Sequence, residues 1–500
     1  MPYVLGIDLG TSSMKGVLIN EMGELVDTVS EPYAVSNPSS GYSEQNPEDW
    51  IIACHYILKN LAIRNVDFNK NLVGISFSGQ MHSLVLADSD FNILRPAILW
   101  NDVRNTTQCE QIMNEFSEEI LEITRNIALE GFTLPKILWV QQNEPEIWKK
   151  TEHIFLPKDY LRYKLTGKCH MDFSDASGTL LLDANKKKWS KKILEKYNIR
   201  HSILPKLVES TDYVGDLLES YKEKYNFKNN IKIFAGGADN ACAALGAGMI
   251  DENESMVSIG TSGVFLSPEG KAHSNYNGKV HLFNHVIPGL SYSMGVTLAA
   301  GNSLQWFKKC FFKNAKYEEI LEGASKIEPG ANGLLFTPYI VGERTPHVDS
   351  TVRGSFVGID IAHTINHFSR AVIEGITFSL KESQELIETE TKKSLNKIVS
   401  LGGGAKSKYW QHIQADIFNS EIITLTVEEG PGYGAAMIAA VGAGWFNSLE
   451  ECAHKLVCYN SPISPNQKNV EFYKKIFQIY KSIYHKTCDI STKLIEIKEN

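Results

Sequence analysis

Short apolar runs separated by polar turns dominate the start of the chain. The run at 3–7 is followed by a polar turn, and a second run at 14–19 resumes beyond it. Two such runs joined by a short turn predict a β-hairpin with a polar tip. The same order returns in the middle of the chain, where runs at 255–259 and 264–266 flank a glycine-rich turn. A hairpin near the start of each half predicts a duplicated domain, and a cleft between two copies is a natural place for ligands.

A change of pattern before the second hairpin indicates where the first domain ends. A strand is expected at 231–234, after which two glycines break the run, and the small residues of 240–245 predict a helix that ends near Gly248. We therefore predict a first domain over 1–248 and a second over 249–500.

The second half of the chain alternates helical and extended patterns. Amphipathic spacing predicts helices at 366–388 and 407–419, and apolar runs predict strands at 398–401 and 422–426. This alternation indicates the α/β class. Near the Lys-rich end, apolar residues recur at helical spacing, which predicts a surface helix followed by a frayed tail.

Composition and charge exclude several kinds of protein. The 500 residues are 43% hydrophobic and 22% charged, close to the averages of globular proteins, which excludes disorder. The net charge of -8 lacks the basic excess that nucleic-acid binding needs. The start of the chain lacks the basic segment of a secretion signal, and the apolar stretch at 435–446 is shorter than the roughly 20 residues that cross a bilayer. We expect a cytoplasmic protein that binds neither nucleic acid nor membranes.

Eight cysteines are scattered along the chain without a CxxC pair. In a large chain without a secretion signal, this pattern indicates reduced thiols. We expect neither a disulfide nor a zinc site.

Three glycine-rich turns are candidates for phosphate binding, because glycine lets backbone N–H groups approach anionic oxygens closely. They are Gly10-Thr11-Ser12, Gly260-Thr261-Ser262-Gly263 and Gly402-Gly403-Gly404-Ala405. None of them continues as a Walker or a Rossmann motif. One such turn alone is more often a plain hairpin or helix cap, but three in one chain favour a phosphate-binding function.

Charged residues beside these turns have a structural and a chemical interpretation. Asp8 could coordinate Mg²⁺ directly or through water, and Lys15 could supply a positive charge for phosphate, although Asp8 could equally cap its turn. Asp239 follows two glycines and precedes a predicted helix, and the local sequence favours an N-cap there. A capping carboxylate that faces a cleft can also accept a proton from a substrate hydroxyl.

Longer motifs resemble one known family over most of the chain. GIDLGTSSMKGVL resembles the first phosphate hairpin of the FGGY family of carbohydrate kinases, GFTLPKILWV (131–140) its first signature, and GSFVGIDIAHTINHFSRAVIEG (354–375) its second. The resemblance implies two duplicated actin-like ATPase (ribonuclease H-like) domains with a catalytic cleft between them. It also implies ATP-dependent phosphorylation of a sugar, with Mg²⁺.

Other segments are similar to those of family members that phosphorylate D-xylulose to D-xylulose 5-phosphate. These segments are YSEQNPEDW, GQMH, LRPAILWNDVR, LPKDYLR, GGADNA and GERTPH. The resemblance makes D-xylulose and MgATP the expected partners, and it leaves a homodimer open.

Residue roles follow from the same resemblance, position by position. The implied sugar-binding residues are Gln80, Met81, His82, Trp100, Asp239 and Asn240. Asp239 is also the implied catalytic base, for which a carboxylate of ordinary basicity is expected to suffice. The implied ATP contacts are Gly10, Thr11, Ser12, Lys15, Gly260, Thr261, Ser262, Gly403, Gly404 and Ala405, and Asp8 is the implied neighbour of Mg²⁺.

Two departures keep alternatives open. Ser83 and Ala238 stand where kinases of xylulose often have glycine, and Met81-His82-Ser83 also resembles gluconate kinases of the same family. D-Gluconate is therefore the alternative substrate. A sugar sensor without catalysis is a further alternative, which the presence of Asp8, Lys15 and Asp239 disfavours. The missing GxGxxG motif disfavours a dehydrogenase.

Overall fold

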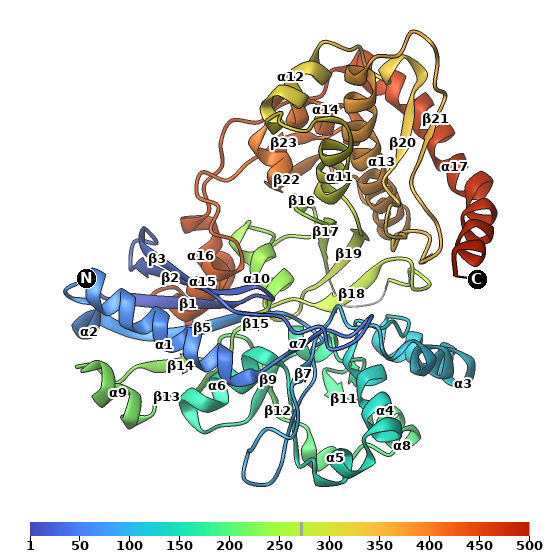
Figure 1. Cartoon of the computed structure of the whole chain (residues 1–500). Helices are drawn as coiled ribbons and strands as arrows, with labels where there is room; N and C mark the ends of the chain where they lie inside the picture. Colours follow the sequence, from blue (N-terminus) through green and yellow to red (C-terminus); the bar gives the residue numbers. More distant parts are fainter. Residues whose placement is uncertain (271–273, 500) are drawn as a thin grey trace.

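Two lobes, each built around one mixed β-sheet, form the molecule (Figure 1). The computed structural model describes residues 1–270 and 274–499. The first sheet has the order β13-β14-β5-β1-β2-β3, with β15 paired to β5. Its strands are β1 (Tyr3–Leu9), β2 (Ser13–Asn20), β3 (Leu25–Pro32), β5 (Leu72–Gly79), β13 (Tyr213–Asp216), β14 (Lys232–Phe234) and β15 (Gly237–Ala238).

The second sheet repeats the central part of the first. Its order is β18-β19-β17-β16-β22-β23, and its strands are β16 (Ser255–Ile259), β17 (Gly263–Glu269), β18 (His281–Asn284), β19 (Ser291–Thr297), β22 (Lys397–Gly402) and β23 (Glu421–Ile423). In both sheets the first hairpin strand pairs antiparallel with the second and parallel with a later strand, β5 or β22. The repeat confirms the predicted duplication and is the arrangement of actin-like, ribonuclease H-like ATPases. The division at residue 248 stays a prediction.

Helices and short strands complete the two lobes. The helices are α1 (Pro47–Arg64), α2 (Phe68–Asn71), α3 (Thr106–Thr124), α4 (Thr133–Asn143), α5 (Pro145–Lys150), α6 (Pro157–Thr166), α7 (Phe173–Ser177), α8 (Lys191–Lys196), α9 (Glu219–Tyr225), α10 (Asp239–Gly246), α11 (Gly301–Phe311), α12 (Tyr317–Ser325), α13 (Ile365–Thr391), α14 (Lys408–Phe418), α15 (Pro431–Gly442), α16 (Leu449–Leu456) and α17 (Gln467–Glu499). The short strands are β4 (Glu44–Gln45), β6 (Val85–Ala87), β7 (Ala97–Ile98), β8 (His153–Phe155), β9 (His170–Asp172), β10 (Leu182–Asp183), β11 (Lys188–Trp189), β12 (Lys206–Val208), β20 (Leu335–Thr337) and β21 (Ser355–Val357).

One predicted element differs from the structure. The expected frayed tail is instead the end of α17, a helix that runs to Glu499. Tyr473 and Tyr480 on this helix are buried, and the Tyr473 hydroxyl donates to Glu374 of α13 at 2.6 Å. This packing anchors the first half of α17 on α13, whereas Ile490, Leu494 and Ile497 near its end are exposed.

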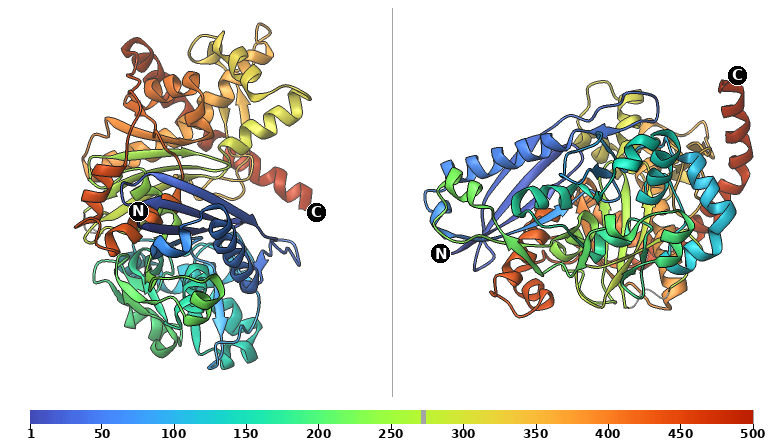
Figure 2. Two further views of the ribbon diagram at one scale, coloured as in Figure 1. Left: turned by 90° about the vertical axis from the view of Figure 1, so that its left-hand side faces the viewer. Right: turned by 90° about the horizontal axis from the view of Figure 1, so that it is seen from below.

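Helix α15 comes from the second half of the chain but packs on the sheet of the first lobe, beside β1 (Figures 1 and 2). A Cβ on Gly6 of β1 would lie 2.1 Å from the carbonyl oxygen of Gly432. A Cβ on Gly434 would lie 2.0 Å from the carbonyl oxygen of Cys242, in α10. Only glycine permits these backbone approaches, which let α15 pack directly on β1 and α10 of the first lobe.

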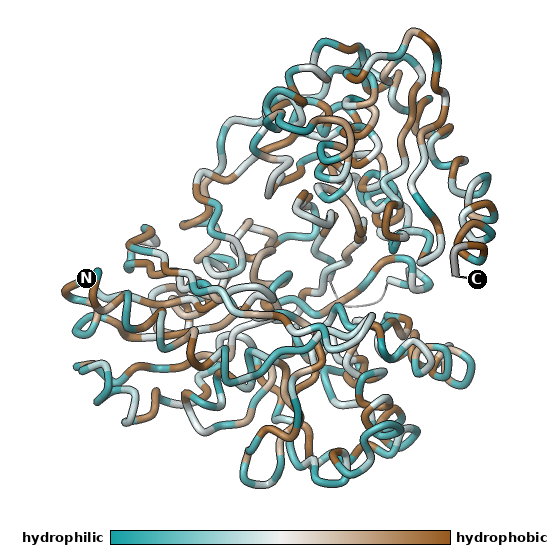
Figure 3. Tube along the Cα trace, in the orientation of Figure 1, coloured by the Kyte–Doolittle hydropathy of each residue, from teal (hydrophilic) through white to brown (hydrophobic). Residues whose placement is uncertain are grey.

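Apolar residues gather on the strands and inner helix faces, while the outer loops are mostly polar (Figure 3). All eight cysteines are free thiols. Among residues 1–270 and 274–499, no helix is long and apolar enough to span a membrane.

Candidate active site

The tip of the first hairpin carries Asp8 and Lys15 side by side. The two residues are paired across β1 and β2, and Asp8 is also paired with Ser78 of β5. Burial raises the pKa of Asp8 to about 6, although the Ser78 hydroxyl and the Lys15 ammonium act in the opposite direction. Its buried Oδ1 atom has no hydrogen-bond partner among the described residues. A buried carboxylate oxygen without a partner fits a Mg²⁺ ion or its water ligand.

Lys15 does not stand free at this tip. Its ammonium forms an ion pair with Glu429, in the segment that leads into α15. The neighbouring Glu428 accepts a hydrogen bond from the amide of Gly402 at 2.7 Å. Two consecutive glutamates therefore contact one predicted phosphate-binding element in each half of the chain.

A hydrogen-bond network ties Thr11 to the predicted sugar-binding residues. The Trp100 indole donates to the Thr11 hydroxyl at 2.9 Å, and that hydroxyl lies 3.4 Å from Gln80 Oε1. Gln45 donates to the Thr11 carbonyl at 2.6 Å and accepts from Gln80 at 3.0 Å. Trp100 remains 45% exposed, so its ring is available to line a pocket.

Met81 and His82 follow β5 at the same edge of the sheet. His82 has a φ of +68° and its Nδ1 lies 2.6 Å from the carbonyl oxygen of Gly178. A carbonyl can only accept, so Nδ1 carries a proton. Burial lowers the pKa of His82 to about 3, and the cations of Lys136 and Arg344 lower it further, against the effect of the Gly178 bond. The ring is therefore neutral, and its Nε2 is an acceptor for a hydroxyl.

Asp239 is the first residue of α10, and the residue in the N-cap position is Ala238. The capping role that the local sequence favoured is therefore wrong. The Asp239 carboxylate instead accepts from the backbone amide of Asn240 at 2.7 Å and from its side-chain amide at 3.0 Å. The same Asn240 amide lies 3.8 Å from the sulfur of Met81, which joins the end of β5 to the start of α10.

The basicity of Asp239 also differs from expectation. Burial raises its pKa from 3.8 to about 7, and the negative charge of Asp8 raises it further, against the two Asn240 bonds. The carboxylate is thus a stronger base than the ordinary one that the sequence suggested. A group with a pKa near neutrality is well suited to take a proton from a sugar hydroxyl.

Two cavities are lined in part by predicted site residues. The smaller one, about 300 Å³, is lined by Asp239 and Asn240 of α10, and from the second half by Ser258, Leu401 and Glu428. Asp239 therefore faces the strand ends of the second sheet.

The larger cavity, about 630 Å³, lies in the second lobe. Its lining includes the predicted ATP contacts Gly260, Thr261, Gly403 and Gly404, but not Ser262 or Ala405. The sequence missed several other lining residues: Asn302, Gln305, Tyr317, Leu321, Tyr409 and Trp410. Aromatic and aliphatic side chains beside glycine-rich turns can bind the adenine ring of a nucleotide while the turns bind its phosphates. The sequence held one signal for these lining residues: Trp410, which lies three residues after Ser407, the N-cap of α14.

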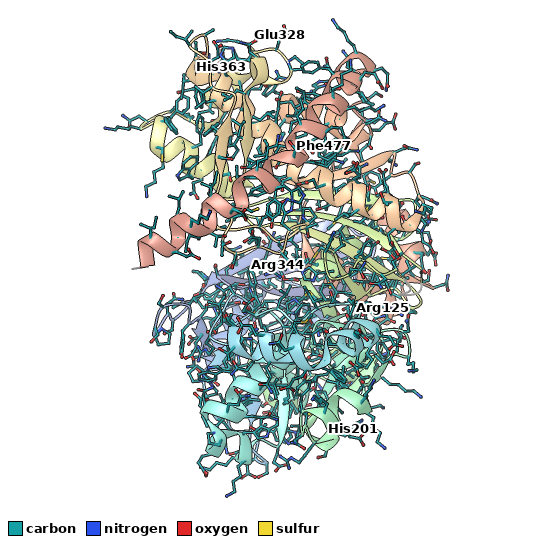
Figure 4. The ribbon with its side chains drawn as sticks, turned by 90° about the vertical axis from the view of Figure 1, so that its right-hand side faces the viewer. Arg125, His201, Glu328, Arg344, His363 and Phe477 are labelled. Carbon is teal, nitrogen blue, oxygen red and sulfur yellow. The ribbon has the colours of Figure 1, made fainter. Side chains whose placement is uncertain are left out.

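Arg344 is a further residue that sequence reasoning did not assign. It belongs to the second half, and Figure 4 labels it where the two lobes meet. Its positive charge lowers the pKa of both His82 and His281, although burial is the main cause for each. Glu429 was missed as well, because nothing near it in the sequence points to Lys15.

Comparison with known proteins agrees with this geometry. The model of the FGGY family of carbohydrate kinases, N-terminal domain, matches residues 3–246, and that of the C-terminal domain matches residues 255–443. The chain is 54% identical over 500 residues to "Xylulose kinase" of Lactococcus lactis subsp. lactis, with all of both chains covered.

Two solved structures from Lactobacillus acidophilus are also similar, each at 27% identity. Ligand-bound xylulose kinase has a TM-score of 0.93, with 97% of this chain and 98% of that chain covered. Gluconate kinase has a TM-score of 0.94, with 99% of each chain covered. Since the two family models match in order and together span most of the sequence, the chain belongs to the FGGY family of carbohydrate kinases.

Proposed function

We propose that the protein transfers the γ-phosphoryl group of ATP to D-xylulose, forming D-xylulose 5-phosphate, with Asp239 as the catalytic base. The observation that carries this proposal is the placement of Asp239. Its carboxylate lies next to Asn240 and, through it, Met81, and it lines a cavity that is closed on the other side by Ser258 and Leu401 of the second lobe. A sugar held by the first lobe, as phosphoryl acceptor, would thus face ATP held by the second lobe, as phosphoryl donor.

Sugar recognition uses hydrogen-bonding groups with defined roles. His82 offers Nε2 as an acceptor, while Asp239 offers carboxylate oxygens and Asn240 an amide. The ring of His82 packs against Phe132 and Phe283, with centroids 4.8 and 5.8 Å away, and its Nδ1 is fixed by the Gly178 carbonyl, so the orientation of Nε2 is fixed as well. Fixed polar groups on a partly apolar wall are typical of small polyol sites.

ATP positioning divides between the lobes. The amides and glycines at Gly260, Thr261, Gly403 and Gly404 line the larger cavity and fit the phosphates and adenosine. Asp8 would hold Mg²⁺, which neutralises charge on the phosphoryl oxygens when bound. Lys15 lies in the hairpin opposite Asp8 and would contact phosphate once released from Glu429.

Proton transfer follows from the pKa of Asp239. Phosphoryl transfer has a loose transition state, so the protein mainly aligns the acceptor and stabilises charge, and the hydroxyl proton leaves late. A carboxylate with a pKa of about 7 accepts this proton more readily than an ordinary aspartate. Closure of the lobes on the sugar would exclude water, which is a smaller nucleophile than the sugar.

D-Gluconate is the second candidate. The resemblance of Met81-His82-Ser83 to gluconate kinases favours it, as does the similarity to a gluconate kinase structure. Arg344, whose positive charge acts on His82, is a candidate partner for a sugar carboxylate. The identity of 54% to a xylulose kinase outweighs these observations. A cytoplasmic location and a homodimer stay predictions.

A sugar panel tests the proposal. ADP release with MgATP is measured for D-xylulose, D-gluconate, L-ribulose and D-ribulose, with Asp239→Asn as the control for contaminating kinases. D-Xylulose should have the highest kcat/KM. A clear preference for D-gluconate or L-ribulose would replace the proposed substrate, and no sugar-dependent release with any of the four would indicate a sensor.

A further inference from the structure

A group of five charged residues is buried in the first lobe, behind the proposed sugar pocket. Lys158 and Arg162 of α6 contact three carboxylates, those of Asp159, Asp172 and Asp175. The Lys158 ammonium lies 2.8, 2.6 and 2.9 Å from these carboxylates in that order, and all five side chains are fully buried. Burying so many charges is costly unless they are paired, so an arrangement of this kind needs a reason other than stability.

Metal binding is not that reason. The oxygen atoms of the three aspartates lie close enough together to hold an ion. The Lys158 ammonium, however, contacts all three carboxylates and already supplies the positive charge there. Burial lowers the pKa of Lys158, but the three carboxylates outweigh it and raise the pKa well above its usual range. The cation therefore stays charged in place.

Ser174 links the buried charged group to the segment 235–238 that precedes Asp239. Asp172 Oδ1 accepts from Lys158, and its Oδ2 accepts from the amide and the hydroxyl of Ser174. Because the hydroxyl proton of Ser174 is donated to Asp172, a lone pair of its oxygen is left for another donor. That donor is the backbone amide of Ala238, at 2.9 Å, which directly precedes Asp239.

Arg162 holds the other end of the same segment. Its guanidinium donates to the carbonyl of Ala235, just before the two glycines that lead to Asp239. Gly236 has a φ of +81°, and a Cβ on it would lie 2.1 Å from the carbonyl oxygen of Phe77. The turn from Ala235 to Ala238 is thus held at both ends and pressed against β5.

Lys158 also contacts the strand that leads to the sugar-binding residues. A Cβ on Gly79, which precedes Gln80, would lie 2.6 Å from Cβ of Lys158. Gly79 and Ala238 are paired in the parallel register of β5 and β15. One buried group therefore touches both segments that present the proposed sugar site.

We propose that Lys158, Asp172 and Ser174 are positioning residues for Asp239. The ion pair of Lys158 fixes Asp172, Asp172 orients the Ser174 hydroxyl, and Ser174 holds the amide of Ala238, so that the next residue presents its carboxylate to the sugar. This inference rests on the proposed function, because it takes Asp239 as the base. It adds three residues that line neither of the two cavities.

Ser174→Ala is the decisive variant, because it removes the link and leaves all five charged residues in place. The matched control is Ser177→Ala in the same helix. Ser177 is buried, its hydroxyl donates to the carbonyl of Ser174 at 2.8 Å, and it accepts the backbone amide of Asn284 at 3.1 Å. Unlike Ser174, its side chain makes no hydrogen bond to residues 235–238, all of which the structure describes. Both variants lose one buried hydroxyl that accepts from the backbone, so comparable decreases in Tm are expected.

The two variants should differ in kinetics. A displaced general base lowers kcat, by about 10- to 100-fold for a shift near 1 Å. Ser174→Ala should show this loss with a KM for D-xylulose changed less than the kcat, and Ser177→Ala should keep a kcat near that of the wild type. Asp172→Asn provides a second test, because an amide cannot accept from both the amide and the hydroxyl of Ser174 while keeping the bond to Lys158. It should lower kcat in the same direction.

Three outcomes would overturn the inference. Ser174→Ala with more than half of the wild-type kcat would show that the Ala238 bond does not position the base. An equal loss in Ser177→Ala would show general loosening of the lobe. Wild-type protein inactive with every sugar of the panel would refute the proposed function, and this inference with it.

Discussion

The Lys15 ammonium lies 2.5 Å from Glu429 Oε2, although 414 positions separate the two residues in the chain. Lys15 stands at the tip of the first hairpin, and Glu429 lies just before α15, the helix that packs on β1. Their side chains are partly exposed, at 34% and 20%. The Glu429 carboxylate is thus paired with the ammonium group that a phosphate of ATP would need to contact.

Glu429→Gln should strengthen ATP binding. The substitution removes the negative charge that competes with phosphate for Lys15, so the KM for ATP should fall by about 2- to 10-fold, as one partly exposed ion pair allows. The Tm should change little for the same reason. Steady-state kinetics at saturating D-xylulose measure the effect.

A matched control is Glu252→Gln, which breaks the pair of Glu252 with Lys393. Glu252 lines neither cavity, so the KM for ATP should be unchanged there. A KM for ATP that rises in Glu429→Gln would mean that Glu429 holds Lys15 in its working position rather than competing with the nucleotide.

Asp8→Asn should separate metal use from sugar binding. Its unpartnered Oδ1 is the proposed site for Mg²⁺ or its water ligand, and a neutral amide binds such a cation more weakly. We expect kcat to fall by about 10²-fold or more, with partial recovery at high Mg²⁺. Calorimetry with D-xylulose should give nearly the same affinity as the wild type. Equal loss of sugar affinity would contradict the assignment.

Asp239→Asn should abolish most activity without loss of stability. Removal of a general base lowers kcat by about 10² to 10⁴-fold. The pKa of this buried acid is raised from 3.8 to about 7, so the native state binds more protons than the unfolded state and stability is lost as pH rises between these values. The neutral amide does not have this cost, so the variant should have a Tm at pH 8 at least equal to that of the wild type. Retention of more than about a tenth of the wild-type kcat would exclude Asp239 as the base.

The pH dependence of the wild type should report the same carboxylate. Asp239 must be ionised to accept the sugar proton, so kcat/KM for D-xylulose should rise with pH and level off above about 7. An acid of ordinary pKa would give a profile flat from pH 5 upward. Kinetics at saturating MgATP in overlapping buffers of constant ionic strength distinguish the two cases. The Asp239→Asn variant should lose the rise near pH 7 and keep only the dependence due to Asp8, whose pKa is raised to about 6.

Local pattern was enough to predict much of the fold. The runs around Asp8 and those at 255–266 form the two predicted hairpins, and the glycines before Asp239 separate a strand from a helix as expected. These elements are encoded by residues that are neighbours in the chain, since turn residues and apolar periodicity act over a few positions. The two glycine-rich turns of the second lobe were likewise found before the cavity that they line.

The charge state of the site could not be predicted in this way. The pKa of Asp239 depends on burial and on the charge of Asp8, which lies on another strand. The cap assigned to Asp239 was wrong by one position, because the helix begins at that residue itself. The neutral state of His82 depends mainly on burial, and the cations of Lys136 and Arg344, from separate segments, lower its pKa further.

The sequence by itself therefore determined the duplicated hairpins, the glycine-rich turns and the set of candidate residues, because each depends on contacts between near neighbours in the chain. Only the tertiary structure decided that α15 returns to the first sheet, that Glu429 meets Lys15, and that Ser174 holds the segment before Asp239. These contacts join positions far apart in the chain, and they form only when the sheets and helices pack together and exclude water from the groups between them.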